Sequence, residues 1–109
     1  MMQQMAVEEL RAHCAARPSL LLDVREAWEV ALAVIRIEGA EWLDIPMNQL
    51  PAHLSALDRT RSIVCICHHG VRSAQVVAFL DRHGFESVYN LAGGIDAWST
   101  RVDANVPRY

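Results

Sequence analysis

The sequence predicts a three-layer α/β fold in which a parallel sheet of about five strands carries helices on both faces. Two observations lead to this prediction. Short apolar runs rich in β-branched residues alternate with segments of helical periodicity, as at residues 62–67 and 73–83. The chain has 109 residues, of which 52% are hydrophobic and 21% charged, so residues 1–109 should form a single domain with its own core.

The chain is predicted to begin with a helix and a buried strand. Residues 7–16 place apolar side chains at helical spacing, and Pro18 ends that pattern. Residues 20–24 form an apolar run of strand length that only Asp23 interrupts. A continuous run of this kind is typical of a strand buried on both faces.

The next segments should be a helix, an extended segment and another helix. Residues 26–34 favour a helix, and residues 39–46 indicate a turn followed by a short extended stretch. Residues 48–57 place leucines on one helical face, and Asn48 could cap that helix.

The second half repeats the alternation of strands and helices. Residues 62–67 are the clearest strand, and residues 86–91 form another. Helices are expected at residues 73–83 and around residues 95–99, each bordered by glycine. The tail, residues 102–109, is expected to be irregular.

The composition excludes several classes of partner. Ten Arg, no Lys and 13 acidic residues leave a net charge of −3, without a basic stripe for nucleic acid. No apolar run approaches the roughly 20 residues that span a membrane, and the N-terminus lacks a signal-peptide pattern. Three cysteines without framework spacing favour a reducing compartment, so we expect a cytoplasmic protein.

Residues 67–73, Cys-His-His-Gly-Val-Arg-Ser, carry the strongest chemical signal. Their position between a buried strand and a helix puts Cys67 at the carboxyl end of a strand, where α/β sheets bind ligands. The N–H groups of the turn can converge on an anion at the positive end of the helix dipole, and Arg72 adds a permanent charge. Because helix N-termini and cations favour thiolates, Cys67 is predicted to be a nucleophile.

Four segments, in order, make the sequence resemble the rhodanese-like sulfurtransferases over nearly its whole length. They are LLDVREAWE at 21–29, IEGAEWLDIPM at 37–47, CHHGVRS at 67–73 and GFESVYNLAGGIDAW at 84–98. The resemblance implies a rhodanese-like domain that moves a sulfane sulfur from thiosulfate or a persulfide donor to a thiophilic acceptor through a persulfide on Cys67. The acceptor would be cyanide, a thiol or a protein, and neither a cofactor nor a metal is implied.

The resemblance also implies roles for the residues around Cys67. The anion-binding loop would consist of His68, His69, Gly70, Val71 and Arg72. Asp23 and Arg25, together with Ser73, would support the loop and the pocket floor. Independently of the resemblance, Asp23 is a single acid in an apolar strand and needs a polar partner, which Arg25 or a loop N–H could supply.

Other interpretations of the same residues stay open. A non-catalytic rhodanese-like binding module is the alternative function, although such modules usually lack the cysteine that this chain keeps. A cysteine-dependent phosphatase is disfavoured because four residues separate Cys67 from Arg72, whereas those phosphatases use five. Cys65 could be a redox partner of Cys67, although core packing is the default. A metal cluster of cysteines 65 and 67 with His68 and His69 is not expected, since adjacent residues on a tight loop rarely point at one ion.

The remaining chemistry-bearing residues are expected to be structural. Cys14 lies on the apolar face of the first helix and should be in the core. Trp28, Trp42 and Trp98 should pack in the core or in the wall of the pocket. His13 has no partner in the sequence and should be a surface residue.

Overall fold

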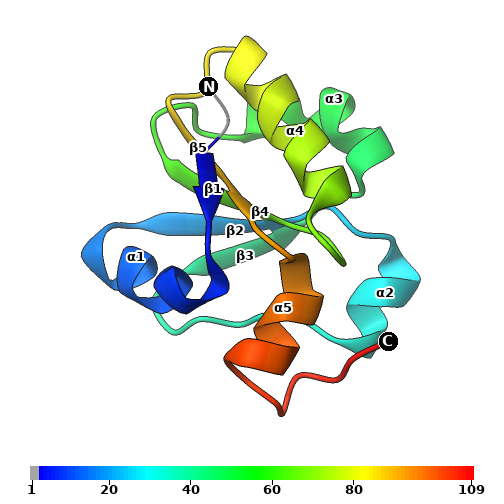
Figure 1. Cartoon of the computed structure of the whole chain (residues 1–109). Coiled ribbons are helices and arrows are strands. Elements are labelled where there is room, and N and C mark those ends of the chain that lie inside the picture. Colours follow the sequence, from blue (N-terminus) through cyan, green and yellow to red (C-terminus); the bar gives the residue numbers. More distant parts are fainter. Residues whose placement is uncertain (1–2) are drawn as a thin grey trace.

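The computed structural model describes residues 3–109 and shows a sheet of five parallel strands in the order β1-β5-β4-β2-β3 (Figure 1). The strands are β1 Gln3–Met5, β2 Ser19–Asp23, β3 Glu41–Asp44, β4 Ser62–Ile66 and β5 Ser87–Leu91. Neighbouring strands are parallel throughout these residues, which confirms the predicted α/β fold. The sequence did not predict β1, because three residues, two of them Gln, show no strand periodicity.

Helices cover both faces of the sheet, as predicted. They are α1 Leu10–Ala16, α2 Ala27–Leu32, α3 Leu50–His53, α4 Val71–Arg82 and α5 Gly94–Arg101, with short 3-10 helices η1 Val7–Glu9, η2 Met47–Gln49 and η3 Leu54–Ala56. In Figure 1, α3 and α4 lie on one side of the sheet and α1 and α5 on the other. Within residues 3–109, no helix has both the length and the apolarity that crossing a membrane requires.

Side chains of the two central strands fill two separate cores. Leu22 and Cys65 face the core under α3 and α4, whereas Leu21 and Val64 face the core under α1 and α5. All five residues of β2 and all five of β4 are buried. This double burial explains why the two strands form continuous apolar runs in the sequence instead of alternating ones.

The predicted helix over residues 48–57 is wrong as a single element. The segment consists of η2, α3 and η3 in succession, and Asn48 lies inside η2 instead of capping a helix. Pro51 stands in the first turn of α3, where its missing N–H costs no helical hydrogen bond, so the α-helical part of the segment begins there and not at Asn48.

The helix predicted from residue 73 begins two residues earlier, at Val71. Gly70, directly before it, adopts the left-handed conformation with φ of 96°. The left-handed turn at Gly70 lets α4 begin at the next residue, so the helix starts inside the predicted loop. This earlier start brings the N-terminus of α4 closer to Cys67 than the sequence predicted.

Candidate active site

Cys67 directly follows β4 and lies at the carboxyl edge of the sheet, as predicted. Its side chain is only 1% exposed and packs in the same core as Cys65. The backbone N–H of Gly70 donates a hydrogen bond to Cys67 Sγ at 3.0 Å. The turn between β4 and α4 therefore curls around the sulfur and aims a donor at it, which favours negative charge there.

The start of α5 holds this turn in place. The N–H groups of Ile95 and Asp96 donate to the carbonyl oxygens of Cys67 and His68 at 2.9 and 3.0 Å. Across a trans peptide the N–H points in the direction opposite to the C=O. The N–H groups of His68 and His69 follow these two carbonyls and therefore point away from α5. Gly94 permits this close packing, because a Cβ at that position would overlap both of the carbonyl oxygens.

Val71 and Arg72 contribute to the site in different ways. The side chain of Val71 is 68% exposed, so this residue contributes backbone at the start of α4. Arg72 makes a two-point ion pair with Glu29 of α2, with nitrogen–oxygen distances of 2.6 and 2.7 Å. The hydrogen bond from Arg72 is the main reason that the pKa of Glu29 falls from 4.5 to about 2. The sequence did not identify Glu29 as this partner. Its negative charge balances the positive charge of Arg72.

Asp23 and Arg25 form the buried pair that the isolated acid suggested. Both side chains are essentially unexposed, and the guanidinium contacts the two carboxylate oxygens at 2.7 and 2.8 Å. Arg25 also donates to the backbone oxygens of Glu29 and Ala33 at 3.3 and 2.6 Å. The pair therefore fastens the end of β2 to α2, and through Glu29 it positions the partner of Arg72.

Tyr109, in the tail that was expected to be irregular, completes this cluster. Its hydroxyl donates to Glu29 Oε1 at 2.9 Å and accepts from Arg25 Nη1 at 3.1 Å. Its ring stacks on His68, with 3.9 Å between the ring centroids and 10° between the planes. Trp28 makes an edge contact with this ring and is 63% exposed, so of its two expected positions the core is wrong, whereas Trp98 is buried. Nothing in the sequence marked Tyr109.

Ser73 and Asn90 lie on the other side of Cys67. The Ser73 hydroxyl oxygen is 3.3 Å from Cys67 Sγ and 2.5 Å from Asn90 Oδ1. The Asn90 amide nitrogen donates to the Gly70 carbonyl at 3.1 Å and to Gln4 Oε1 at 3.0 Å. Sequence reasoning missed Asn90, although it is a polar residue between apolar neighbours in a predicted strand and is buried in the structure.

The other two cysteines lie on apolar surfaces, as expected. Cys65 is fully buried, and burial raises the pKa of its thiol; Cys14 is 8% exposed, and its pKa is raised for the same reason. All three cysteines are free. Cys67 differs from the other two in the hydrogen bond that its sulfur accepts from the backbone N–H of Gly70 at the start of α4.

Potential ligand atoms of His68, His69 and Asp96 lie within 4.8 Å of one another. The two imidazole rings are stacked, with 3.9 Å between centroids and 26° between planes. Lone pairs in such nearly parallel rings cannot both point at one ion, and Arg108 pairs with Asp96 at 2.9 Å. We therefore interpret the cluster as two stacked imidazole rings beside an ion pair and not as a metal site.

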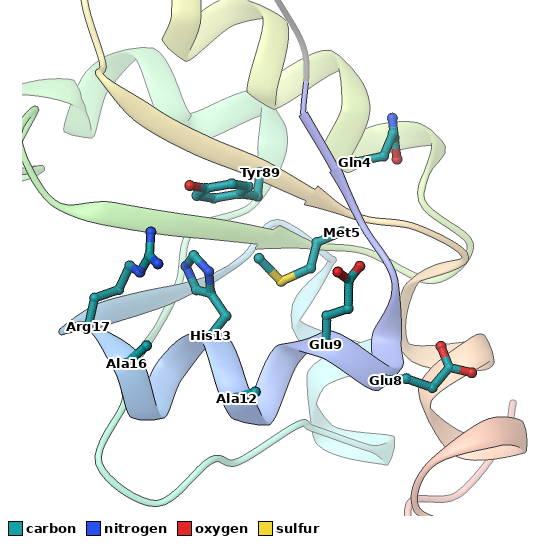
Figure 2. Close-up of a pocket in the computed structure, with 9 residues that line it drawn as sticks. All are labelled: Gln4, Met5, Glu8, Glu9, Ala12, His13, Ala16, Arg17 and Tyr89. Atoms are coloured by element: carbon teal, nitrogen blue, oxygen red, sulfur yellow. The ribbon is translucent and has the colours of Figure 1, made fainter.

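A hollow of about 630 Å³ lies between α1 and the β1–β5 edge of the sheet (Figure 2). His13 lines it together with Tyr89, and its ring nitrogen is 2.7 Å from Ser62 Oγ. His13 is therefore a half-buried residue at the surface, with a hydrogen-bond partner that the sequence did not indicate. Gln4 lines the hollow and accepts from Asn90, but the residues that contact the Cys67 sulfur do not line it, so the hollow is separate from the site.

Comparisons with known proteins show which family the chain resembles. The sequence profile of the Rhodanese-like domain family matches residues 6–101. A sulfurtransferase of Allochromatium vinosum is 38% identical over 80 residues, which cover 73% of this chain and 71% of that protein. The putative sulfurtransferase YtwF of Bacillus subtilis is 40% identical over 78 residues, covering 72% and 71%. The crystal structure of a rhodanese-like domain protein from Staphylococcus aureus has a TM-score of 0.78 at 29% identity and covers 99% of both chains.

Proposed function

The chain belongs to the rhodanese-like domain family, and from this premise we propose that it is a sulfurtransferase that carries sulfane sulfur as a persulfide on Cys67. The observation that carries the proposal is the sulfur of Cys67 at the end of β4, with the Gly70 N–H donating to it at the N-terminus of α4. This arrangement stabilises a sulfur anion at Cys67, whereas burial disfavours the thiolates of Cys14 and Cys65. Relatives named as sulfurtransferases support the reaction class.

The proposed reaction is a double displacement. With thiosulfate as the donor, the Cys67 thiolate attacks the outer sulfur, the sulfur–sulfur bond of thiosulfate breaks, and sulfite leaves with that bonding pair. Cys67 then carries a persulfide whose terminal sulfur is negative. A cyanide ion or a thiolate attacks this terminal sulfur, and thiocyanate or a new persulfide leaves while the Cys67 thiolate is regenerated.

Each group around Cys67 has a proposed role in this reaction. N–H groups of the turn from His68 to Arg72 bind the negative sulfur as an oxyanion hole binds oxygen. Arg72 closes the loop and, held by Glu29, provides the positive end of a fixed ion pair at the mouth. Asp23 and Arg25 keep α2 and Glu29 in place and do not transfer sulfur.

The size of the loop favours sulfur over phosphate. Four residues separate Cys67 from Arg72, and the turn is narrow enough for the Gly70 N–H to reach the Cys67 sulfur at 3.0 Å. A tetrahedral phosphate needs a wider ring of N–H groups than a single sulfur atom does. A small sulfur-containing anion such as thiosulfate, with a thiol or a protein as the acceptor, is therefore the proposed substrate class.

Mass spectrometry of the protein after incubation with thiosulfate tests the proposal. The chain should gain the mass of one sulfur atom, peptide mapping should place it on Cys67, and cyanide should remove it as thiocyanate. Cys67→Ser should lose both steps, whereas the matched variants Cys14→Ser and Cys65→Ser should keep them. An unlabelled protein would support the binding-module alternative, and a label on Cys65 would mean that the two thiols act together.

A further inference from the structure

The hydroxyl of Ser73 lies between two groups that can each accept its proton. Asn90 Oδ1 is 2.5 Å from the hydroxyl oxygen, and Cys67 Sγ is 3.3 Å from it. A serine hydroxyl has one proton, so it can donate to one of these acceptors at a time. Both acceptors are buried, with exposed fractions of 3% and 1%, so no bulk water replaces the hydrogen bond that is lost.

The orientation of the Asn90 amide is fixed by its other partners. The Gly70 carbonyl can only accept, so the amide nitrogen must face it, and the second amide hydrogen goes to Gln4 Oε1. The amide oxygen therefore faces Ser73. Gly70 and Gln4, on different elements, together prevent Asn90 from turning its amide around.

The stronger acceptor decides where the Ser73 proton lies at rest. An amide oxygen accepts a hydrogen bond more strongly than the sulfur of a neutral thiol does, so Ser73 donates to Asn90. A lone pair of the Ser73 oxygen then faces Cys67 Sγ. That lone pair suits the S–H of a thiol and repels a thiolate, which would need the proton instead.

We propose that Asn90 is a positioning residue that competes with Cys67 for the Ser73 proton. When the thiol proton leaves to water, the Ser73 O–H rotates from Asn90 Oδ1 to the thiolate sulfur, and no bond within Ser73 breaks. When Cys67 becomes a persulfide, the charge moves to the terminal sulfur and the O–H returns to Asn90. Asn90 thus disfavours the bare thiolate relative to both the thiol and the persulfide, which makes the thiolate more reactive and favours loading with sulfur.

This inference rests on the proposed function only in taking Cys67 as the reacting thiol. The test measures the fraction of Cys67 that is thiolate, from its ultraviolet absorbance, with the Cys67→Ser variant as the blank. The measurement is made at the pH where Cys67 of the unmodified chain is half thiolate. This reading needs neither a sulfur donor nor turnover. A protein without sulfurtransferase activity would still show the predicted pattern, so the two proposals can fail separately.

Three variants are compared. Asn90→Leu removes the competing acceptor with a side chain of similar size, and the Gly70 carbonyl keeps its hydrogen bond from the Ala74 N–H. The ratio of thiolate to thiol should rise about fivefold, the equivalent of one net hydrogen bond. Ser73→Ala should lower the ratio about fivefold, and the double variant should match Ser73→Ala. If Asn90→Leu does not fold, Asn90→Ala is measured in its place.

Ser62→Ala serves as the control, since Ser62 is a buried, hydrogen-bonded serine at the other end of β4. It should leave the ratio unchanged. The proposal is overturned if the Asn90 variants lower the ratio of thiolate to thiol. It is also overturned if these variants change the ratio equally with and without Ser73, since Asn90 would then only support the sheet. An unchanged ratio in Ser73→Ala would overturn it as well.

Discussion

Replacing Glu29 with Gln tests the ion pair that joins α2 to the active-site loop. The folded chain holds the pKa of Glu29 at about 2, mainly through the hydrogen bond from Arg72, against an ordinary value of 4.5. That difference corresponds to about 3 kcal/mol of stability at neutral pH. Since Arg72 is 33% exposed, solvent screening reduces the expected figure to about 2 kcal/mol.

The sign of the pH dependence follows from the lowered pKa. The folded state favours the carboxylate, so the stabilisation is complete above about pH 4.5 and is lost as the pH falls toward 2. Glu29→Gln cannot be protonated and lacks this contribution at every pH. The variant should therefore be about 2 kcal/mol less stable than the unmodified chain at neutral pH and nearly equal to it near pH 2.

Urea unfolding at a series of pH values, followed by tryptophan fluorescence, to which the buried Trp98 contributes, measures this difference. Taking the difference between the two chains removes the contribution of the other acids. The matched control is Glu8→Gln, which breaks a pair with Arg101 in which both side chains are about half exposed, and it should have little effect. Stability curves of Glu29→Gln and the unmodified chain that stay parallel down to pH 2 would refute the reasoning.

Three further substitutions test the supports of the loop. Asp23→Ala leaves the buried Arg25 without its charged partner, so it should lower the unfolding free energy by about 3–5 kcal/mol and reduce sulfur loading in parallel. A variant with a native melting temperature but no activity would instead indicate that Asp23 acts directly in catalysis. Gly94→Ala should displace the turn around Cys67 and slow sulfur loading, whereas Gly84→Ala, with a similar positive φ but open space around its Cβ, should cost stability alone; equal loading rates would contradict the close-packing argument. Tyr109→Phe removes the hydroxyl that links Glu29 and Arg25 while keeping the ring, and should cost about 1–2 kcal/mol in thermal or urea unfolding, so an unchanged stability would show that the tail is not held by this hydroxyl.

Much of the fold could be predicted because its signals are local. Strands buried on both faces are continuous apolar runs, as in β2 and β4, and each is followed by a helix with its own periodicity. The failures have local causes as well. Strand β1 is too short to show a period, and the leucines of residues 48–57 indicated one helix where three short helical elements follow one another.

The sequence by itself determined the centre of the site. Cys67, Gly70 and Arg72 are close in the chain, and the strand–turn–helix that contains them follows from local residue preferences, so the position of the sulfur at a strand end could be predicted. Only the tertiary structure decided which distant groups contact this centre. Glu29 lies 43 residues from Arg72, Tyr109 lies 80 residues from Glu29, and Asn90 of β5 contacts Ser73 of α4. The physical reason is that such pairs depend on strand order and on the packing of α2 and the tail, which no local pattern in the sequence specifies.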